Sequence, residues 1–128
     1  MSPATPGRKP KVLIAEDEKP LARALALKLG AEGIDTDVVH DGDAVKQKLA
    51  STAYDLILMD LMMPKHDGFA VLEEMKQKGN TTPIVIMSNL SQDTDRNRAA
   101  IAGAAHYFVK ADIKLADVVA YIKKNVHL

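Results

Sequence analysis

Residues 56–60 (LILMD) form an uninterrupted apolar run that stops at the carboxylate of Asp60. The same pattern recurs at residues 12–15, which stop at Glu16 and Asp17, at residues 84–87, which stop at Ser88, and at residues 107–109, which stop at Lys110. Short continuous apolar runs are typical of parallel strands covered on both faces. The carboxyl ends of such strands meet at one edge of the sheet, where open α/β folds bind ligands. We therefore expect the three carboxylates, the hydroxyl and the ammonium to share one pocket, suited to a divalent cation and a phosphoryl group.

Apolar residues between these runs recur at helical spacing. Leu21, Leu25 and Leu29 follow Pro20, which suits a first helical turn. We expect four further helices, capped by Asp41 or Asp43, by Asp67, by Ser91 or Asp93, and by Asp112. Residues 34–39 alternate between polar and apolar, as in an edge strand. Strand and helix thus alternate five times, which predicts an α/β fold: a five-stranded parallel sheet, doubly wound with helices on both faces.

Composition limits the classes of function. The chain has 128 residues, enough for one domain, with 47% hydrophobic and 27% charged residues. Its 17 basic residues balance 17 acidic ones, so no net charge would attract nucleic acid, and we expect no direct contact with it. The absence of cysteine excludes disulfides and thiolate metal sites.

The sequence predicts two segments, a flexible leader over residues 1–10 and one domain over residues 11–128. The leader contains three prolines, a glycine and two cations, but no apolar core of the kind that a secretory signal needs. No apolar stretch approaches the roughly 20 residues that span a bilayer, so we expect no membrane insertion and a cytoplasmic location.

The residues at the strand ends indicate phosphoryl chemistry on their own. An aspartate such as Asp60 can accept a phosphoryl group as an acyl phosphate. Because two anions must then approach each other, a cation is needed, and Glu16 and Asp17 add to Asp60 the hard oxygen ligands that Mg²⁺ prefers. Lys110 would bring positive charge to the transferred oxygens, and the Ser88 hydroxyl could donate a hydrogen bond to them. Each residue taken singly is also typical of a helix cap, a turn or a surface charge, and their joint placement favours the chemical interpretation.

Four motifs in combination resemble the CheY-like receiver domain of two-component response regulators. They are residues 13–18 (LIAEDE), residues 58–64 (LMDLMMP) with 67–68 (DG), residues 87–88 (MS) and residues 107–110 (YFVK). The resemblance extends from residue 11 to about residue 126. It implies the flavodoxin-like (βα)5 topology with strand order 2-1-3-4-5, which the residue pattern alone does not give.

The resemblance also implies a role for each site residue. Asp60 would be the phosphoacceptor, and its donor would be a sensor histidine kinase or a histidine phosphotransfer protein. Glu16, Asp17 and Asp60 would bind Mg²⁺ together with the main-chain carbonyl of Met62. Lys110 would contact the phosphoryl group. Such a module receives phosphate and assists its own phosphorylation and dephosphorylation, and we do not expect it to be an enzyme in the ordinary sense.

Ser88 and Tyr107 match the switch pair of the family. When the phosphoryl group draws the hydroxyl inward, the aromatic side chain follows and remodels the face made by the fourth helix, fifth strand and fifth helix. A downstream protein partner would bind this face, and the chain would be a monomer or a phosphorylation-dependent dimer.

Two positions depart from the pattern of the family. Asn89 stands where a small residue usually follows the switch hydroxyl, which puts the rates of phosphorylation and dephosphorylation in doubt. Ala111 stands where a proline often follows the lysine. In receivers with that proline a cis peptide bond helps to aim the lysine, and we expect a cis bond before Ala111 despite its cost of about 2.5–4 kcal/mol.

Three other functions compete with this interpretation. A flavin-binding module of the same architecture would need a phosphate-binding hydroxyl and glycine loop after the first strand, where this chain has acids. A phosphatase with an aspartate nucleophile would need that nucleophile after the first strand. A degenerate receiver would serve only as a protein-docking module, and the presence of all five site residues argues against it.

Overall fold

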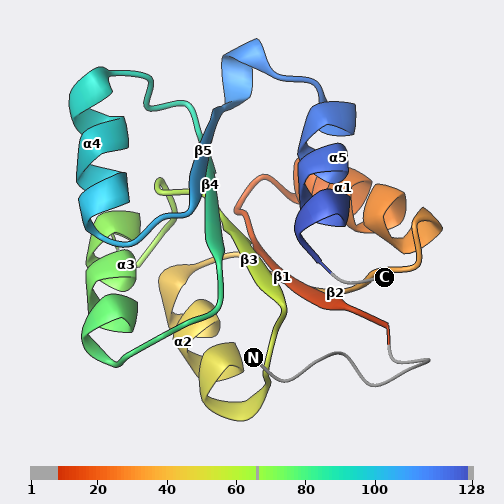
Figure 1. Cartoon of the computed structure of the whole chain (residues 1–128), viewed down its shortest axis with the longest axis horizontal. Helices are drawn as coiled ribbons and strands as arrows, with labels where there is room; N and C mark the ends of the chain where they lie inside the picture. Colours follow the sequence, from red (N-terminus) through yellow and green to blue (C-terminus); the bar gives the residue numbers. More distant parts are fainter. Residues whose placement is uncertain (1–8, 66, 127–128) are drawn as a thin grey trace.

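The computed structural model describes residues 9–65 and 67–126, which form a five-stranded parallel sheet with helices on both faces (Figure 1). The strands are β1 (Lys11–Ala15), β2 (Asp35–Val39), β3 (Leu56–Met59), β4 (Ile84–Ser88) and β5 (His106–Val109). The helices are α1 (Lys19–Ala31), α2 (Gly42–Ser51), α3 (Gly68–Gln77), α4 (Asp93–Ile101) and α5 (Leu115–Asn125), with a 3-10 turn, η1 (Lys110–Asp112). The strand order is β2-β1-β3-β4-β5, which confirms the predicted fold and the edge position of β2.

The sheet separates two apolar layers, because successive side chains of a strand point to opposite faces. Helices α1 and α5 cover one face, and α2, α3 and α4 cover the other (Figure 1). On β3, Leu56 and Leu58 pack in the layer under α1 and α5, whereas Ile57 and Met59 pack in the opposite layer. Every residue of β3 is buried, so the strand holds Asp60, the residue that follows it, in a fixed position.

Two of the expected helix caps are confirmed and two are wrong. Asp41 and Asp67 are the N-caps of α2 and α3, and their side chains accept hydrogen bonds from the backbone N–H groups of Ala44 and Phe69. The N-cap of α4 is Gln92, and that of α5 is Lys114, so neither Ser91, Asp93 nor Asp112 is a cap.

The reason is the same in both helices: an acid at the third helical position binds the N-cap backbone. Asp95 accepts from the N–H of Gln92 at 3.2 Å, and Asp117 accepts from the N–H of Lys114 at 3.4 Å. A side chain at this position can satisfy a donor at the start of a helix as well as an N-cap side chain can. Asp112 instead lies in η1.

The predicted leader falls mostly outside the described residues, which begin at Lys9. Pro10 is buried, and its carbonyl accepts a hydrogen bond from the N–H of Asp35 at 2.9 Å, so this residue packs on the sheet. Within residues 9–65 and 67–126, no helix is both long enough and apolar enough to cross a membrane.

Candidate functional site

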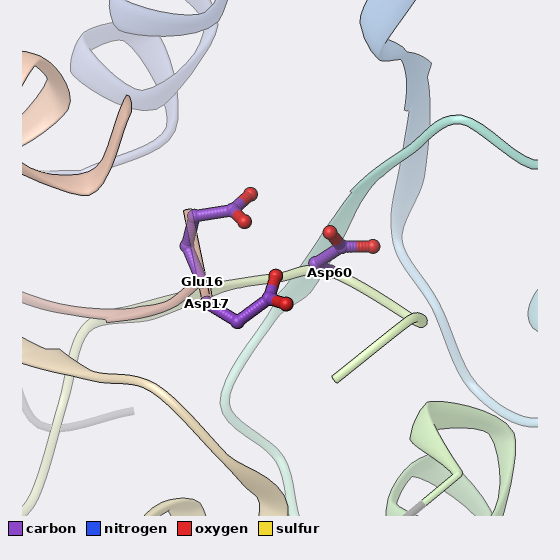
Figure 2. Close-up of side chains that lie close together, drawn as sticks. All are labelled: Glu16, Asp17 and Asp60. Carbon is purple, nitrogen blue, oxygen red and sulfur yellow. The ribbon is translucent and has the colours of Figure 1, made fainter. Parts of the chain in front are cut away.

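Three acids come together where β1 and β3 end. Glu16 and Asp17 follow β1, and Asp60 follows β3, its neighbour in the sheet (Figure 2). One carboxylate oxygen from each residue lies within 4.8 Å of the others. Glu16 and Asp60 are buried, and Asp17 is exposed. The predicted convergence of three carboxylates is therefore present.

Hydrogen bonds on both sides fix the Asp60 carboxylate. Its Oδ1 accepts from the backbone N–H of Met62 at 2.9 Å, and its Oδ2 accepts from Lys110 Nζ at 2.7 Å. The backbone N–H of Asp60 donates to the carbonyl of Ala15 at 2.9 Å and so continues the β1–β3 pairing by one residue. The acid is thus held at the edge of the sheet in one orientation.

Lys110 Nζ contacts three carboxylates. It lies 2.6 Å from Glu16 Oε1, 2.6 Å from Glu18 Oε2 and 2.7 Å from Asp60 Oδ2. Burial works against the charged ammonium, but the hydrogen bonds that Lys110 donates to Asp60, Glu16 and Glu18 outweigh it and raise the pKa of Lys110 above its usual value. Lys110 is therefore a cation throughout the physiological pH range.

The expected cis bond at Lys110–Ala111 is wrong. None of the peptide bonds between described residues is cis, and Lys110 nevertheless reaches Asp60. The residue begins η1, so the chain turns directly after β5. Three carboxylates then hold the ammonium, and their attraction aims the side chain without a cis turn.

Glu18 is a member of this charge cluster that sequence reasoning missed. An acid next to a proline-started helix is typical of a helix start, and its partner Lys110 lies 92 residues away in the sequence. The only available signal was the third consecutive acid in residues 16–18 (EDE), next to two residues already assigned to the site.

Burial and neighbouring charge affect Glu16 in opposite directions. Desolvation raises the pKa of Glu16, the hydrogen bonds from Lys110 and from the Glu18 backbone lower it, and the nearby Asp60 charge raises it, with a net increase. The N–H of Glu18 donates to Glu16 Oε2 at 3.0 Å. Glu16 is thus a buried carboxyl held by one cation and one peptide.

Ser88 and Tyr107 lie on neighbouring strands and are connected through the backbone of Leu90. Leu90 N–H donates to Ser88 Oγ at 3.3 Å, and the Tyr107 hydroxyl donates to the Leu90 carbonyl at 2.6 Å. Ser88 is fully buried, and Tyr107 is half-buried. Burial raises the pKa of Tyr107, although a hydrogen bond with Ser88 opposes this. Leu90 is a second residue that the sequence analysis missed.

The loop after Asp60 folds back tightly onto α3. Met62 pairs with Asp67 in an isolated antiparallel bridge, and Gly68 N–H donates to the Leu61 carbonyl at 3.0 Å. A Cβ on Gly68 would lie 2.5 Å from Leu61 Cα, so only glycine allows this approach. The loop that carries Met62 is therefore placed by backbone contacts. The role of the Met62 carbonyl as a metal ligand stays a prediction.

The donor set fits a hard divalent cation. All three acids of the cluster offer oxygen ligands, which Mg²⁺ prefers, and Asp17 is exposed, so a hydrated ion can reach the site. Of these three acids, Glu16 and Asp60 contact Lys110. Asp17 makes no ion pair with Lys110 within the described part of the chain. The cluster thus keeps a negative charge that a divalent cation would neutralise.

Comparisons with known proteins agree with the geometry. The family model of the response regulator receiver domain matches residues 12–123. The response regulator ArlR of Staphylococcus saprophyticus is 41% identical over 100 residues, which cover 78% of this chain and 45% of that protein. The transcriptional regulatory protein DltR of Streptococcus agalactiae is 35% identical over 100 residues, with the same 78% and 45% coverage. The chain therefore spans less than half the length of these curated relatives.

Solved structures give the same result. The receiver domain of the Francisella response regulator 1452 has a TM-score of 0.83 and 30% identity, and the match covers 91% of this chain and 98% of that one. The BeF3-activated N-terminal receiver domain of Klebsiella pneumoniae RstA has a TM-score of 0.83 and 25% identity, with 92% of this chain and 99% of that one covered.

Proposed function

We propose that this chain, which belongs to the response regulator receiver domain family, accepts a phosphoryl group on Asp60. Membership in the family supports phosphoacceptor function in two-component signalling and does not favour a flavin-binding or docking-only module. The observation that carries the assignment is the position of Asp60. It is a buried carboxylate at the end of the central strand, between an ammonium at 2.7 Å and two further acids.

The proposed reaction transfers a phosphoryl group from a phosphohistidine. Asp60 Oδ forms a bond to phosphorus while the phosphorus–nitrogen bond of the donor breaks. The electron pair of that bond returns to the imidazole nitrogen, and the ring takes up a proton. Lys110 follows the transferred oxygens, because its ammonium is already within 2.7 Å of the accepting carboxylate. Ser88 Oγ is the hydroxyl that would donate to one of these oxygens.

Glu16, Asp17 and Asp60, with the Met62 carbonyl, would hold Mg²⁺ in this site. The ion would neutralise part of the charge that builds up when two anionic groups approach each other. Because protein carboxylates supply only some of its ligands, waters and phosphoryl oxygens would complete the shell, and binding without phosphate would be weak.

The backbone contacts of Leu90 support a switch role for Ser88 and Tyr107. If Ser88 Oγ turns toward a phosphoryl oxygen, Leu90 N–H loses its acceptor, and the carbonyl that holds the Tyr107 hydroxyl moves with the same segment. Tyr107 would then change position on the face formed by α4, β5 and α5. A local charge would in this way shift a population between two surface conformations.

The partners of the whole protein follow from its family and remain proposals. The donor would be a sensor histidine kinase or a histidine phosphotransfer protein, and a downstream protein would bind the α4-β5-α5 face. We expect a monomer or a phosphorylation-dependent dimer that works in the cytoplasm without direct contact with nucleic acid.

The role of the acids can be tested with acetyl phosphate, a small phosphodonor. Wild-type protein should gain one phosphoryl group in the presence of Mg²⁺ and far less in its absence. Asp17→Ala should lose both Mg²⁺ affinity and phosphorylation, because it removes the exposed carboxylate among the three proposed metal-binding acids. Asp35→Ala is the matched control, since Asp35 is an exposed acid on β2 and belongs to no part of the site. Unchanged Mg²⁺ affinity in Asp17→Ala would contradict the proposed metal site.

A further inference from the structure

The Glu18 carboxylate has no structural task in its own helix. Glu18 is the N-cap of α1, yet its side chain makes no capping hydrogen bond, and Pro20 removes one of the donors that a cap would serve. The backbone of Glu18 makes the contacts at the start of α1: its N–H donates to Glu16 Oε2 at 3.0 Å, and its carbonyl accepts from Ala22 N–H at 3.0 Å. The side chain instead reaches Lys110 Nζ at 2.6 Å.

The three partners of Lys110 differ sharply in burial. The side chains of Glu16 and Asp60 are 1% and 5% exposed, whereas that of Glu18 is 58% exposed. The buried pair is sufficient to hold the ammonium, because an unpaired carboxylate in either position would carry a large desolvation penalty. The Glu18 carboxylate can return to water at little cost, since exposed ion pairs contribute little.

An ammonium has three N–H donors, and here three carboxylates lie within reach of them. A phosphoryl oxygen that binds Lys110 must therefore displace one carboxylate. Glu18 is the partner that leaves most easily, because it alone regains full hydration when it is released.

We infer that Glu18 is a positioning residue that occupies the place of the phosphoryl oxygen on Lys110 and so slows the phosphorylation of Asp60. The inference rests on the proposed function, and it gives the Lys110–Glu18 contact a regulatory task. The exchange of Glu18 for a phosphoryl oxygen would also break the contact between the start of α1 and η1, at the carboxyl edge of the sheet.

The variant Glu18→Gln tests this role, because it keeps the backbone contacts and replaces the carboxylate by a neutral group of the same shape. With acetyl phosphate and saturating Mg²⁺, it should be phosphorylated about two- to five-fold faster than wild type, the range expected for an exposed ion pair. The matched control is Glu32→Gln, which removes the same charge from an exposed pair with Lys123 at 2.6 Å. Its rate should equal that of wild type.

The same pair of measurements in a Lys110→Gln background isolates the route of the effect. The background reacts more slowly, but Glu18→Gln should give no acceleration there, because the contact that it weakens is already gone. Equal acceleration in both backgrounds would mean that Glu18 merely repels an anionic donor, and no acceleration in either would remove its role altogether. Both results overturn the inference while leaving Asp60 as the acceptor. If wild-type Asp60 itself gains no phosphoryl group, the proposed function fails, and the inference fails with it.

Discussion

At the scale of single residues, ion pairs rather than a cis peptide bond direct Lys110 toward Asp60. Lys110 lies on a trans peptide bond and still contacts Asp60, because Glu16 and Glu18 draw the ammonium toward the same point. The missing proline at Ala111 therefore does not misplace the lysine. The contact that replaces it joins residues far apart in the sequence, which explains why no local pattern revealed it.

A second residue-scale contact gives a prediction about pH. The Tyr54 hydroxyl donates to Asp37 Oδ2 at 2.7 Å, and this hydrogen bond is the largest cause that lowers the pKa of Asp37 from 3.8. Burial is the main cause that raises the pKa of Tyr54 to about 12. An acid whose pKa is lower in the folded state stabilises the fold at pH values above its pKa in the unfolded chain. A tyrosine whose pKa is higher in the folded state stabilises the fold at pH values below its pKa in the unfolded chain.

Tyr54→Phe should therefore lower the free energy of unfolding by about 1 kcal/mol at pH 7, a value discounted for the partial exposure of Asp37. The difference from wild type should shrink as the pH falls below about 4, because Asp37 is then protonated in the unfolded chain and later in the folded one. Urea titrations at pH 7 and pH 3 measure both values. Tyr121→Phe is the control, since the Tyr121 hydroxyl makes no hydrogen bond among the described residues. An equal loss at both pH values would rule out the charged acceptor.

At the scale of elements, the sequence predicts the strand ends better than the helix caps. Strand ends were predicted correctly because apolar runs stop sharply at polar residues, and Asp41 and Asp67 cap their helices as expected. The caps predicted for α4 and α5 were wrong, because Asp95 and Asp117 accept hydrogen bonds from the N-cap N–H groups from inside the helix.

The tight contact between the loop after Asp60 and α3 predicts a large effect for a small change. Gly68→Ala would place a methyl carbon 2.5 Å from Leu61 Cα and 2.8 Å from its carbonyl oxygen. Backbone atoms cannot yield as a flexible side chain can, so we expect a loss of about 1–3 kcal/mol in the free energy of unfolding. Slower phosphorylation should accompany it, because the loop that carries the Asp60 partner Met62 would shift.

Gly30 provides the matched control for this change. It lies in α1, and an added Cβ would have nothing within 4 Å, so Gly30→Ala should stabilise the helix by about 0.5–1 kcal/mol. Denaturant unfolding of the two variants measures both effects. A Gly68→Ala protein as stable as wild type would contradict the steric account of the loop.

At the scale of the whole molecule, the site and the proposed signalling face are joined through β4 and β5. Ser88 ends β4, Tyr107 lies on β5, and Leu90 connects them between β4 and α4. The sequence predicted both ends of this connection from the resemblance. It did not predict the role of Leu90 between them, because Leu90 acts through its backbone and its side-chain type gives no indication of this role.

Beryllofluoride, an analogue of the phosphoryl group, tests this connection in the presence of Mg²⁺. Beyond the loops around Asp60, backbone amide shifts should be large at residues 88–90, at Tyr107 and over the surface from residue 91 to residue 122. They should be small on the opposite side, around α2 and the start of β2. Shifts that stay within the loops around Asp60 would mean that the phosphoryl group does not reach the α4-β5-α5 face.

The central claim is that Asp60 is the phosphoacceptor, and the intact mass of the chain tests it most directly. After incubation with acetyl phosphate and Mg²⁺, the wild-type mass should rise by one phosphoryl group, because Asp60 follows the central strand and lies beside an ammonium at 2.7 Å and two further acids. Asp60→Asn should keep the fold and show no gain. A gain of one phosphoryl group that persists in Asp60→Asn would contradict the claim.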